Sequence, residues 1–199
     1  MTRSLTPSIP ALGQLPNLFS ALRLLAAPLV VWLIYSKRFE LALFLTVPIG
    51  LSDWADGYLA RRLGNVSRLG TYLDPAADKV LLVAAFVTLG TIGAIPSALV
   101  MLVLGRDVVI VAGVVLLWKL RGRKEFTPLG IGKISTVFQI MTVLVVLVSL
   151  VAPLRLIQNV RLVCFYVTAL FTISSGIAYV GKGIRMADSR TAGSAQNSP

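Results

Sequence analysis

Six long apolar stretches, separated by short segments rich in arginine, lysine and glycine, dominate the pattern of hydrophobic and polar positions in this chain. A helix needs about 20 predominantly apolar residues to cross a bilayer, and each stretch meets or approaches that length. Because lipid offers the backbone no hydrogen-bond partners, such stretches form helices. The pattern therefore predicts an all-α, polytopic membrane protein. The six predicted spans are Leu15–Tyr35, Leu41–Ala60, Asp74–Ala94, Ile95–Trp118, Leu129–Val151 and Val160–Val180.

Basic residues in the connecting segments are distributed unevenly between the two sides of the predicted bundle. Only four, Lys37, Arg38, Arg155 and Arg161, fall on the side away from the termini. Lysine and arginine accumulate in cytoplasmic loops, so we expect both termini in the cytoplasm and the protein in the inner or plasma membrane. The basic residues on the side of the termini are Arg3, Arg61, Arg62, Arg68, Lys119, Arg121, Arg123, Lys124, Lys182, Arg185 and Arg190.

The two ends of the chain differ from its apolar body. Residues 1–14 contain one arginine and no apolar run, which predicts a cytoplasmic N-terminal segment, and the first apolar run lacks a cleavage site and is expected to be retained. Residues 187–199 are rich in serine, glycine, asparagine and glutamine, a composition that predicts a disordered cytoplasmic tail. Residues 15–186 are then one membrane domain.

Composition agrees with the membrane class and limits the partners. Of 199 residues, 56% are hydrophobic and 14% are charged, and the mean hydropathy is +0.84. The net charge of +11 could suggest nucleic acid. No basic segment carries the interleaved aromatic residues of a single-strand binder, so nucleic acid is not expected and anionic lipid headgroups are the more natural counter-charge. The absence of histidine excludes imidazole ligands and imidazole bases.

Ionisable residues nevertheless lie within the predicted spans. Each is costly in a bilayer unless it is paired or binds a ligand. Their number in six short helices indicates a polar cavity inside the bundle. They are Arg23, Asp53, Asp56, Asp74, Asp78, Lys79, Arg106, Asp107 and Lys133.

Four of the aspartates belong to one pattern, Asp53-x2-Asp56-Gly57-x2-Ala60-Arg61-x8-Gly70-x3-Asp74-x3-Asp78. Residues three or four apart share a helix face, so each pair of aspartates projects together from one of two antiparallel helix ends. Clustered carboxylate oxygens hold hard divalent cations. Four carboxylates could bracket two cations about 3.5–4 Å apart, the arrangement used for in-line phosphoryl displacement.

The other residues of the pattern suit a phosphate ligand. Gly57 lets a phosphate or ribose approach the backbone, and Gly70 permits an unusual backbone angle where the chain turns back. Arg61 supplies a planar fork that can bind pyrophosphate oxygen. Salt-bridged surface charges at helix ends are the plainer interpretation, but four aspartates with Gly, Ala and Arg at fixed spacings favour a metal site.

This pattern resembles the signature of the CDP-alcohol phosphatidyltransferase family, and every position of it is met. The resemblance extends over roughly residues 15–185 and includes Pro16-Asn17, Arg23 and Gly132-Lys133. It implies that an alcohol hydroxyl displaces CMP from CDP-diacylglycerol in phospholipid biosynthesis. It also implies a homodimer and two metal ions, Mg²⁺ or Mn²⁺, at the four aspartates.

The resemblance assigns roles to single residues. Asp53, Asp56 and Asp74 are expected to hold the metals. Asp78 is expected to hold metal as well and to act as general base on the acceptor hydroxyl. Ser67 fits a polar loop residue equally well. The implied CDP-lipid-binding residues are Asn17, Gly57, Ala60, Arg61, Ser67 and Gly70.

The acceptor is defined less closely by the sequence. A phosphorylated acceptor needs cations in the cavity, and Arg106 and Lys133 are the best candidates for acceptor binding. Arg23 and Lys79 are weaker candidates, because Lys79 also fits a role in balancing the aspartates.

Two motifs point to different acceptors. Gly132-Lys133, followed by Thr136 and Gln139, is similar to phosphatidylglycerophosphate synthases, which favours glycerol-3-phosphate. Those synthases usually carry Arg-Glu in the fourth span, whereas Arg106-Asp107 is similar to cardiolipin synthases, whose acceptor is phosphatidylglycerol. A phosphatidylinositol-type or other acceptor also stays open.

A transporter, or a structural membrane adaptor, would also place helices in a bilayer. Transporters more often show paired repeats and helices broken near the midplane. Pro48 and Gly50 do interrupt the second span, but the aspartates lie at one membrane face. An adaptor has no use for four clustered aspartates, so an enzyme is favoured.

Overall fold

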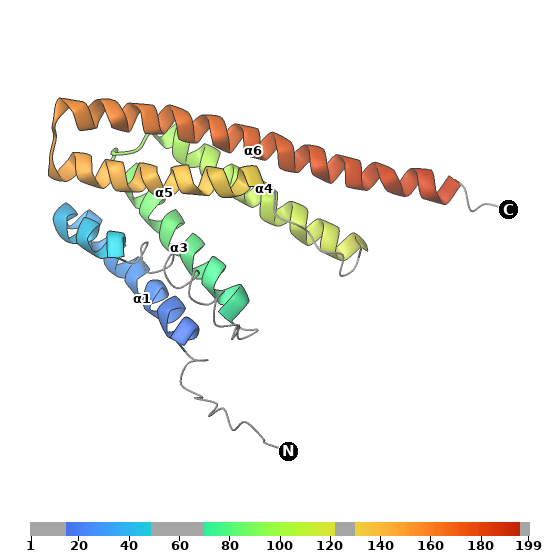
Figure 1. Cartoon of the computed structure of the whole chain (residues 1–199), viewed down its shortest axis with the longest axis horizontal. Coiled ribbons are helices and arrows are strands. Elements are labelled where there is room, and N and C mark those ends of the chain that lie inside the picture. Colours follow the sequence, from blue (N-terminus) through green and yellow to red (C-terminus); the bar gives the residue numbers. More distant parts are fainter. Residues whose placement is uncertain (1–14, 49–69, 122–129, 196–199) are drawn as a thin grey trace, which may run out of the picture. The chain divides into compact units, whose positions relative to one another are not determined.

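The computed structural model describes the backbone of residues 15–48, 70–121 and 130–195, and the side chains of residues 24–48, 79–113, 115 and 130–182. Every regular element in these ranges is a helix, which confirms the all-α class (Figure 1). A short apolar helix covers Phe39–Pro48. The longer helices are α1 (Leu15–Tyr35), α3 (Gly70–Thr91), α4 (Ser97–Arg121), α5 (Gly130–Val151) and α6 (Arg155–Ala195).

The predicted spans and the observed helices agree closely where both are described. The helix α1 has the predicted bounds, and α4 and α5 differ from them by a few residues. The helix α3 begins at Gly70 rather than Asp74, so Gly70 is helical and does not form the turn expected there. The second half of the span predicted at 41–60 lies outside the described residues.

The last helix is longer than predicted at both ends. It begins at Arg155 and continues to Ala195, so residues 187–195 are helical where a disordered tail was expected. Extending an existing helix is far easier than nucleating one, and no proline interrupts the chain between Pro153 and Pro199. At 41 residues α6 is about 60 Å long, twice the thickness of a hydrocarbon core.

A tight turn joins α3 to α4. Gly93 adopts a φ of 75°, its N–H donates to the carbonyl of Gly90 at 3.0 Å, and the N–H of Ala94 donates to the carbonyl of Leu89 at 2.9 Å. This pair of bonds is the Schellman arrangement, in which glycine takes the left-handed position after the helix. A Cβ on Gly90 would lie 2.6 Å from Cγ2 of Val100, so the end of α3 lies close against the start of α4.

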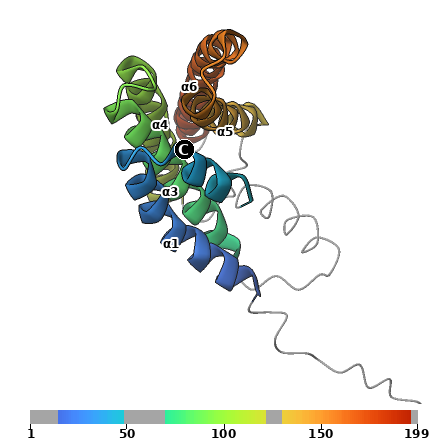
Figure 2. The ribbon, with the colours of Figure 1, turned by 90° about the vertical axis from the view of Figure 1, so that its left-hand side faces the viewer.

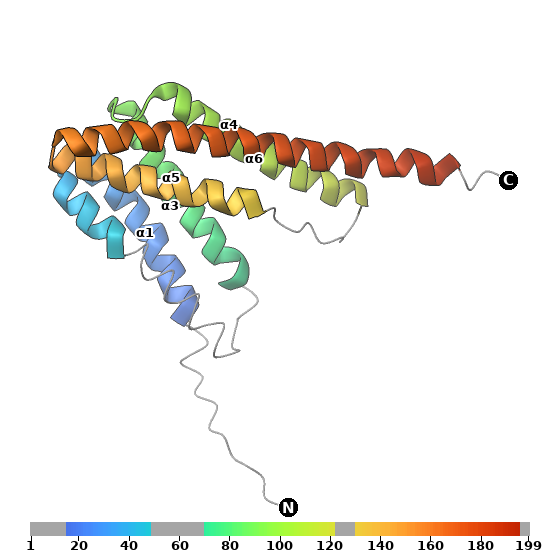
Figure 3. The same cartoon turned by 45° about the horizontal axis from the view of Figure 1, so that its top comes forward.

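The chain forms two compact units, Met1–Thr88 and Leu89–Pro199. In the second unit α6 packs against both α5 and α4 (Figure 2). The helices α5 and α6 are antiparallel neighbours, because only residues 152–154 separate them, and α6 runs past the start of α5 (Figure 3). This unit contains the polar cluster described below.

The buried faces of α5 and α6 are unusually rich in small polar side chains. They carry serine, threonine and glutamine beside a few apolar residues, whereas many large apolar side chains are exposed. Tyr166 and Ile177, for example, are 76% and 68% exposed. Small polar residues between helices and apolar residues outside are typical of helix packing in lipid. Within the described residues, Gly130–Val151 and Arg155–Lys182 are long and apolar enough to cross a membrane.

Candidate functional site

The predicted metal and CDP-lipid sites fall largely outside the part of the chain that the structure describes. Two of the predicted residues, Asp74 and Asp78, lie on α3, and Asn17 and Gly70 lie in the first turns of α1 and α3. Because α3 is a continuous helix from Gly70, Asp74 and Asp78 are one turn apart on one helical face, as the spacing predicted. The predicted residues outside the described ranges are Asp53, Asp56, Gly57, Ala60, Arg61 and Ser67.

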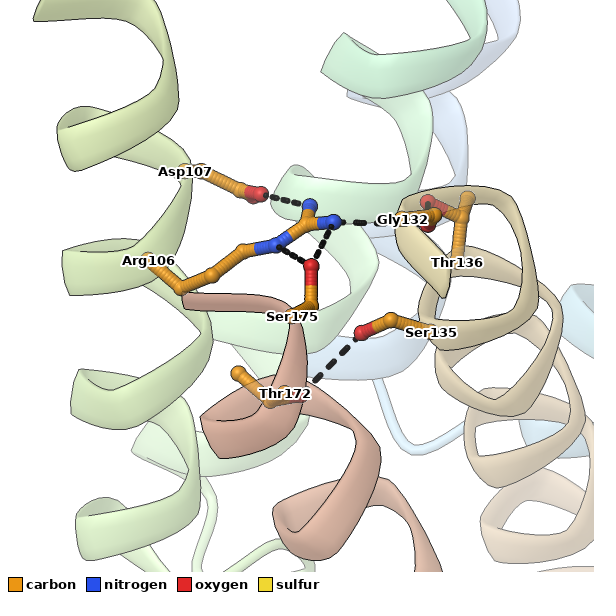
Figure 4. Close-up of polar contacts among 7 residues, drawn as sticks. All are labelled: Arg106, Asp107, Gly132, Ser135, Thr136, Thr172 and Ser175. Atoms are coloured by element: carbon orange, nitrogen blue, oxygen red, sulfur yellow. Dashed lines mark hydrogen bonds and ion pairs between the residues drawn. The ribbon is translucent and has the colours of Figure 1, made fainter. Parts of the chain in front are cut away.

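The best-defined polar cluster of the second unit is centred on Arg106 of α4 (Figure 4). Its side chain is only 7% exposed, and the neighbouring Asp107 side chain is 14% exposed. Nη1 of Arg106 donates to Oδ1 of Asp107 at 2.9 Å. A cation at this depth needs its charge balanced and its N–H groups satisfied, and Asp107 supplies the charge.

The other contacts of Arg106 reach across to α5 and α6. Nε and Nη2 both donate to Oγ of Ser175, at 3.1 and 2.8 Å. Nη2 also donates to the backbone carbonyl of Gly132 at 3.3 Å. The guanidinium carbon lies 5.8 Å from the centroid of the Tyr179 ring, within range of a cation–π interaction. Arg106 therefore ties three helices together.

Gly132 makes room for this cluster. A Cβ at this position would lie 2.7 Å from the hydroxyl of Tyr179 and 3.1 Å from Nη2 of Arg106. Its carbonyl also accepts the Thr136 hydroxyl at 3.1 Å, a bond within the first turns of α5. Gly132 is therefore required for the close approach of α4 and α6 to the start of α5.

A series of hydroxyl contacts continues from the cluster along α5 and α6. Ser135 and Thr172 lie 3.4 Å apart through their hydroxyl oxygens, and Thr142 and Thr168 lie 2.7 Å apart. Thr168 also donates to the carbonyl of Phe138 at 3.1 Å. These four side chains are fully buried. The contacts fix the register of α5 against α6, and with it the alignment of Ser175 and Gly132 around Arg106.

Lys133, the second predicted acceptor residue, has different surroundings. It follows Gly132 directly but is exposed, whereas Arg106 is buried. The structure thus brings the two cations to the same end of α5 without placing both inside the cluster. An exposed ammonium beside a buried guanidinium can attract an anion, while the guanidinium supplies a fixed direction.

Ser175 and Tyr179 were not identified from the sequence. Serine and tyrosine residues in an apolar run are ordinary. A signal was nevertheless present, because Thr168, Thr172, Ser175 and Tyr179 are spaced by four, three and four residues and so share one face of a helix. On α5 the positions of Gly132, Ser135, Gln139 and Thr142 have the complementary spacing.

Gly132→Ala is expected to destabilise the folded protein. The added methyl group must displace the Tyr179 hydroxyl and crowd Arg106, and overpacking of this kind costs about 1–3 kcal/mol. Thermal unfolding in detergent should show a lower Tm. Gly130→Ala is the matched control, because nothing lies within 4 Å of a Cβ there. Equal Tm values for the two variants would show that Gly132 is not a packing constraint.

Comparison with known proteins links the chain to one family. Residues 13–174 match the CDP-alcohol phosphatidyltransferase family. The chain is 30% identical over 177 residues to the CDP-diacylglycerol–glycerol-3-phosphate 3-phosphatidyltransferase of Aquifex aeolicus. This alignment covers 87% of this chain and 97% of the Aquifex protein. The chain is 35% identical over 183 residues to the chloroplastic enzyme 1 of the same name from Oryza sativa, which covers 83% of this chain and 56% of the rice protein.

The chain is also similar to proteins named cardiolipin synthase. A putative cardiolipin synthase of Mycobacterium tuberculosis is 36% identical over 122 residues, 61% of this chain and 58% of that protein. The human cardiolipin synthase (CMP-forming) is 39% identical over 101 residues, half of this chain and 34% of that protein. The chain thus spans little more than half the length of the rice and mycobacterial relatives, but nearly all of the Aquifex protein.

Proposed function

The chain belongs to the CDP-alcohol phosphatidyltransferase family, and from this premise we propose that it makes phosphatidylglycerophosphate from CDP-diacylglycerol and glycerol-3-phosphate. The similarity to the Aquifex aeolicus protein carries the proposal. It extends over 97% of that protein, and the name of that protein specifies glycerol-3-phosphate as the acceptor. The chain is accordingly an enzyme of phospholipid biosynthesis in a membrane.

The proposed step is a single phosphoryl displacement. The acceptor hydroxyl oxygen forms a bond to the phosphorus that carries the diacylglycerol, and the pyrophosphate bond to CMP breaks. CMP leaves with the bridging oxygen, and the hydroxyl proton passes to the Asp78 carboxylate. A carboxylate within reach of the hydroxyl can act as such a base, since it binds the proton as the oxygen becomes nucleophilic.

Two divalent cations, Mg²⁺ or Mn²⁺, are proposed at Asp53, Asp56, Asp74 and Asp78. The donor set is entirely carboxylate, which suits hard cations that prefer oxygen ligands, and histidine is absent from the chain. The one-turn separation of Asp74 and Asp78 on α3 supports a shared ligand face. Bound cations would neutralise the negative charge that develops on the phosphoryl oxygens.

The nucleotide end of the donor is proposed to lie against the segment between the aspartate pairs. Arg61 would pair with the pyrophosphate, because its planar fork binds phosphate oxygens bidentately. Gly57 would leave space for the ribose. The full proposed set is Asn17, Gly57, Ala60, Arg61, Ser67 and Gly70.

The acceptor phosphate is proposed to bind between Lys133 and Arg106. Lys133 is exposed and lies in the first turn of α5, at the end of the candidate span. Arg106 has five N–H donors, and the contacts given above use four of them within the described residues. A phosphate dianion at the start of α5 would meet both cations.

Lys133→Gln is expected to raise the apparent KM for glycerol-3-phosphate about ten- to hundred-fold, with the KM for CDP-diacylglycerol little changed. A hydrogen bond to a charged group contributes about 1.5–3 kcal/mol, and this one acts on the acceptor alone. Initial rates of CMP release at varied acceptor concentrations measure it. Lys37→Gln, which removes an exposed lysine after α1, is the control. An unchanged acceptor KM would remove Lys133 from the site.

Cardiolipin synthesis, with phosphatidylglycerol as acceptor, is the second candidate. The Arg106-Asp107 pair and the cardiolipin synthase relatives favour it, although the similarities to the mycobacterial and human proteins cover only 61% and 50% of this chain. Purified protein in mixed micelles with CDP-diacylglycerol and Mg²⁺ is given either glycerol-3-phosphate or phosphatidylglycerol. We expect CMP release with glycerol-3-phosphate. Release with phosphatidylglycerol alone would establish the second candidate, and release with neither would contradict both.

We propose six transmembrane spans, with both termini and the aspartate pattern on the cytoplasmic side of the cell membrane, and a homodimer as the functional form. The uneven distribution of basic residues supports this orientation. A glycerol-3-phosphate site also suits the cytoplasmic side, where a water-soluble phosphate ester can reach the start of α5 directly.

A further inference from the structure

We propose that Ser175 and Tyr179 of α6 are positioning residues that direct Arg106 towards the phosphate of the acceptor. The inference rests on the proposed function and extends it to a face of α6 to which the family resemblance assigns no role. Both residues lie beyond residue 174, where the match to the family ends.

Ser175 fixes the plane of the guanidinium. Its Oγ accepts hydrogen bonds from Nε at 3.1 Å and from Nη2 at 2.8 Å, two donors on the same edge of Arg106. A single oxygen that bonds both donors of one edge restricts rotation about the end of the side chain. Ser175 is fully buried, so water does not replace its oxygen in the folded protein.

Tyr179 limits the position of the guanidinium from a second direction. The ring centroid lies 5.8 Å from the guanidinium carbon, which favours the cation over the ring. The Tyr179 hydroxyl reaches the backbone of α5, because it lies 2.7 Å from where a Cβ of Gly132 would be. Tyr179 therefore sets the distance between Arg106 and the first turn of α5.

These contacts leave a defined part of Arg106 for a ligand. The Nε and Nη2 donors go to Ser175 and to the carbonyl of Gly132. Nη1 has two N–H groups, and one of them donates to Asp107. Among the described residues, the second N–H of Nη1 is the donor that these contacts leave for a phosphate oxygen. The direction of this N–H depends on the orientation of the guanidinium. Ser175 holds that orientation through hydrogen bonds to the Nε/Nη2 edge, and Tyr179 holds it through the contact between its ring and the guanidinium.

The two residues should therefore affect acceptor binding and leave donor binding unchanged. Without the Ser175 hydroxyl, two buried N–H groups lose their acceptor, and Arg106 turns towards other oxygens. The Nη1 donor then no longer points at the phosphate, although Arg106 itself is still present.

Ser175→Ala is compared with Ser149→Ala in the purified full-length protein. Ser149 is also buried, but its hydroxyl donates to the carbonyl of Val146 in its own helix. CMP release is first measured with glycerol-3-phosphate varied at saturating CDP-diacylglycerol, which gives the acceptor KM. It is then measured with CDP-diacylglycerol varied at saturating glycerol-3-phosphate, which gives the donor KM. We expect Ser175→Ala to raise the acceptor KM about tenfold or more, with the donor KM close to that of Ser149→Ala.

Conservative variants separate positioning from packing. Ser175→Thr keeps the hydroxyl and should restore most of the acceptor affinity. Tyr179→Phe keeps the ring and should have a smaller effect on acceptor KM than Tyr179→Leu. An acceptor KM for Ser175→Ala within about twofold of the wild-type value would overturn the inference, since the lost bonds join a charged group. Equal increases in both KM values would also overturn it, because a packing role alone would produce them.

Failure of the proposed function is recognised separately with the wild-type protein. If it releases CMP only with phosphatidylglycerol, the proposed acceptor is wrong, and the Ser175→Ala comparison is made with that lipid. A raised KM for phosphatidylglycerol alone would still support the positioning role. An unchanged KM for phosphatidylglycerol would overturn it.

Discussion

Asp74→Asn is expected to abolish CMP release while the protein stays folded in detergent. Asparagine keeps the shape of the side chain but removes one negative charge from a site proposed to hold two divalent cations. Asp74 lies on α3, one turn before Asp78. The rate of CMP release at saturating Mg²⁺, together with the Tm in detergent, measures the effect.

Glu40→Gln is the matched control for Asp74→Asn. It exchanges an exposed carboxylate in the short helix Phe39–Pro48 for an amide of the same shape, outside the aspartate pattern. It should retain wild-type turnover. If Asp74→Asn keeps more than about a tenth of the wild-type rate at saturating Mg²⁺, the assignment of Asp74 as a metal ligand is wrong.

Hydropathy alone was enough to predict the main helices. Backbone groups in lipid must bond to each other, so a run of about 20 apolar residues has little choice of structure. The bounds of α1 and α5 agree with the prediction for this reason. The end of α6 was not predicted, because residues 187–195 are polar and only their continuity with a formed helix favours a helical conformation.

The candidate sites were predictable to different degrees. Asp74 and Asp78 are close in sequence, so a helical period places them together without knowledge of the tertiary fold. The surroundings of Arg106 depend instead on Gly132 and Ser175, which lie 26 and 69 residues away. Such contacts follow from the register between helices, which here is set by several small hydroxyl side chains rather than by one recognisable motif.

The Arg106 contacts also revise the sequence-based view of acceptor binding. The sequence suggested Arg106 and Lys133 together as the acceptor-binding cations. In the structure one is buried among hydrogen-bond acceptors and the other is exposed, so they are expected to contribute differently. Lys133 has a flexible ammonium group that is expected to attract the acceptor phosphate. Arg106 has a planar guanidinium with N–H groups in fixed directions, so it is expected to orient that phosphate.

Asp78→Asn should lower turnover far more than it lowers binding of the CDP-lipid. Loss of a general base typically costs about 10²–10⁴-fold in rate, because the acceptor hydroxyl must then lose its proton without assistance. Loss of one of several metal ligands would instead weaken metal and donor binding together. We therefore expect a large decrease in kcat, with the Kd of CDP-diacylglycerol close to the wild-type value at saturating Mg²⁺.

The comparison with Asp74→Asn makes this prediction decisive for the division of roles. Both variants remove one carboxylate charge from the first half of α3 and exchange it for an amide of the same shape. If Asp78 is the base as well as a metal ligand, its variant binds donor lipid nearly normally at saturating Mg²⁺ but turns over slowly, whereas the Asp74 variant requires more Mg²⁺ to bind donor at all. Donor binding that falls in step with turnover in Asp78→Asn would make Asp78 mainly a metal ligand. The base would then have to be another group near the acceptor hydroxyl.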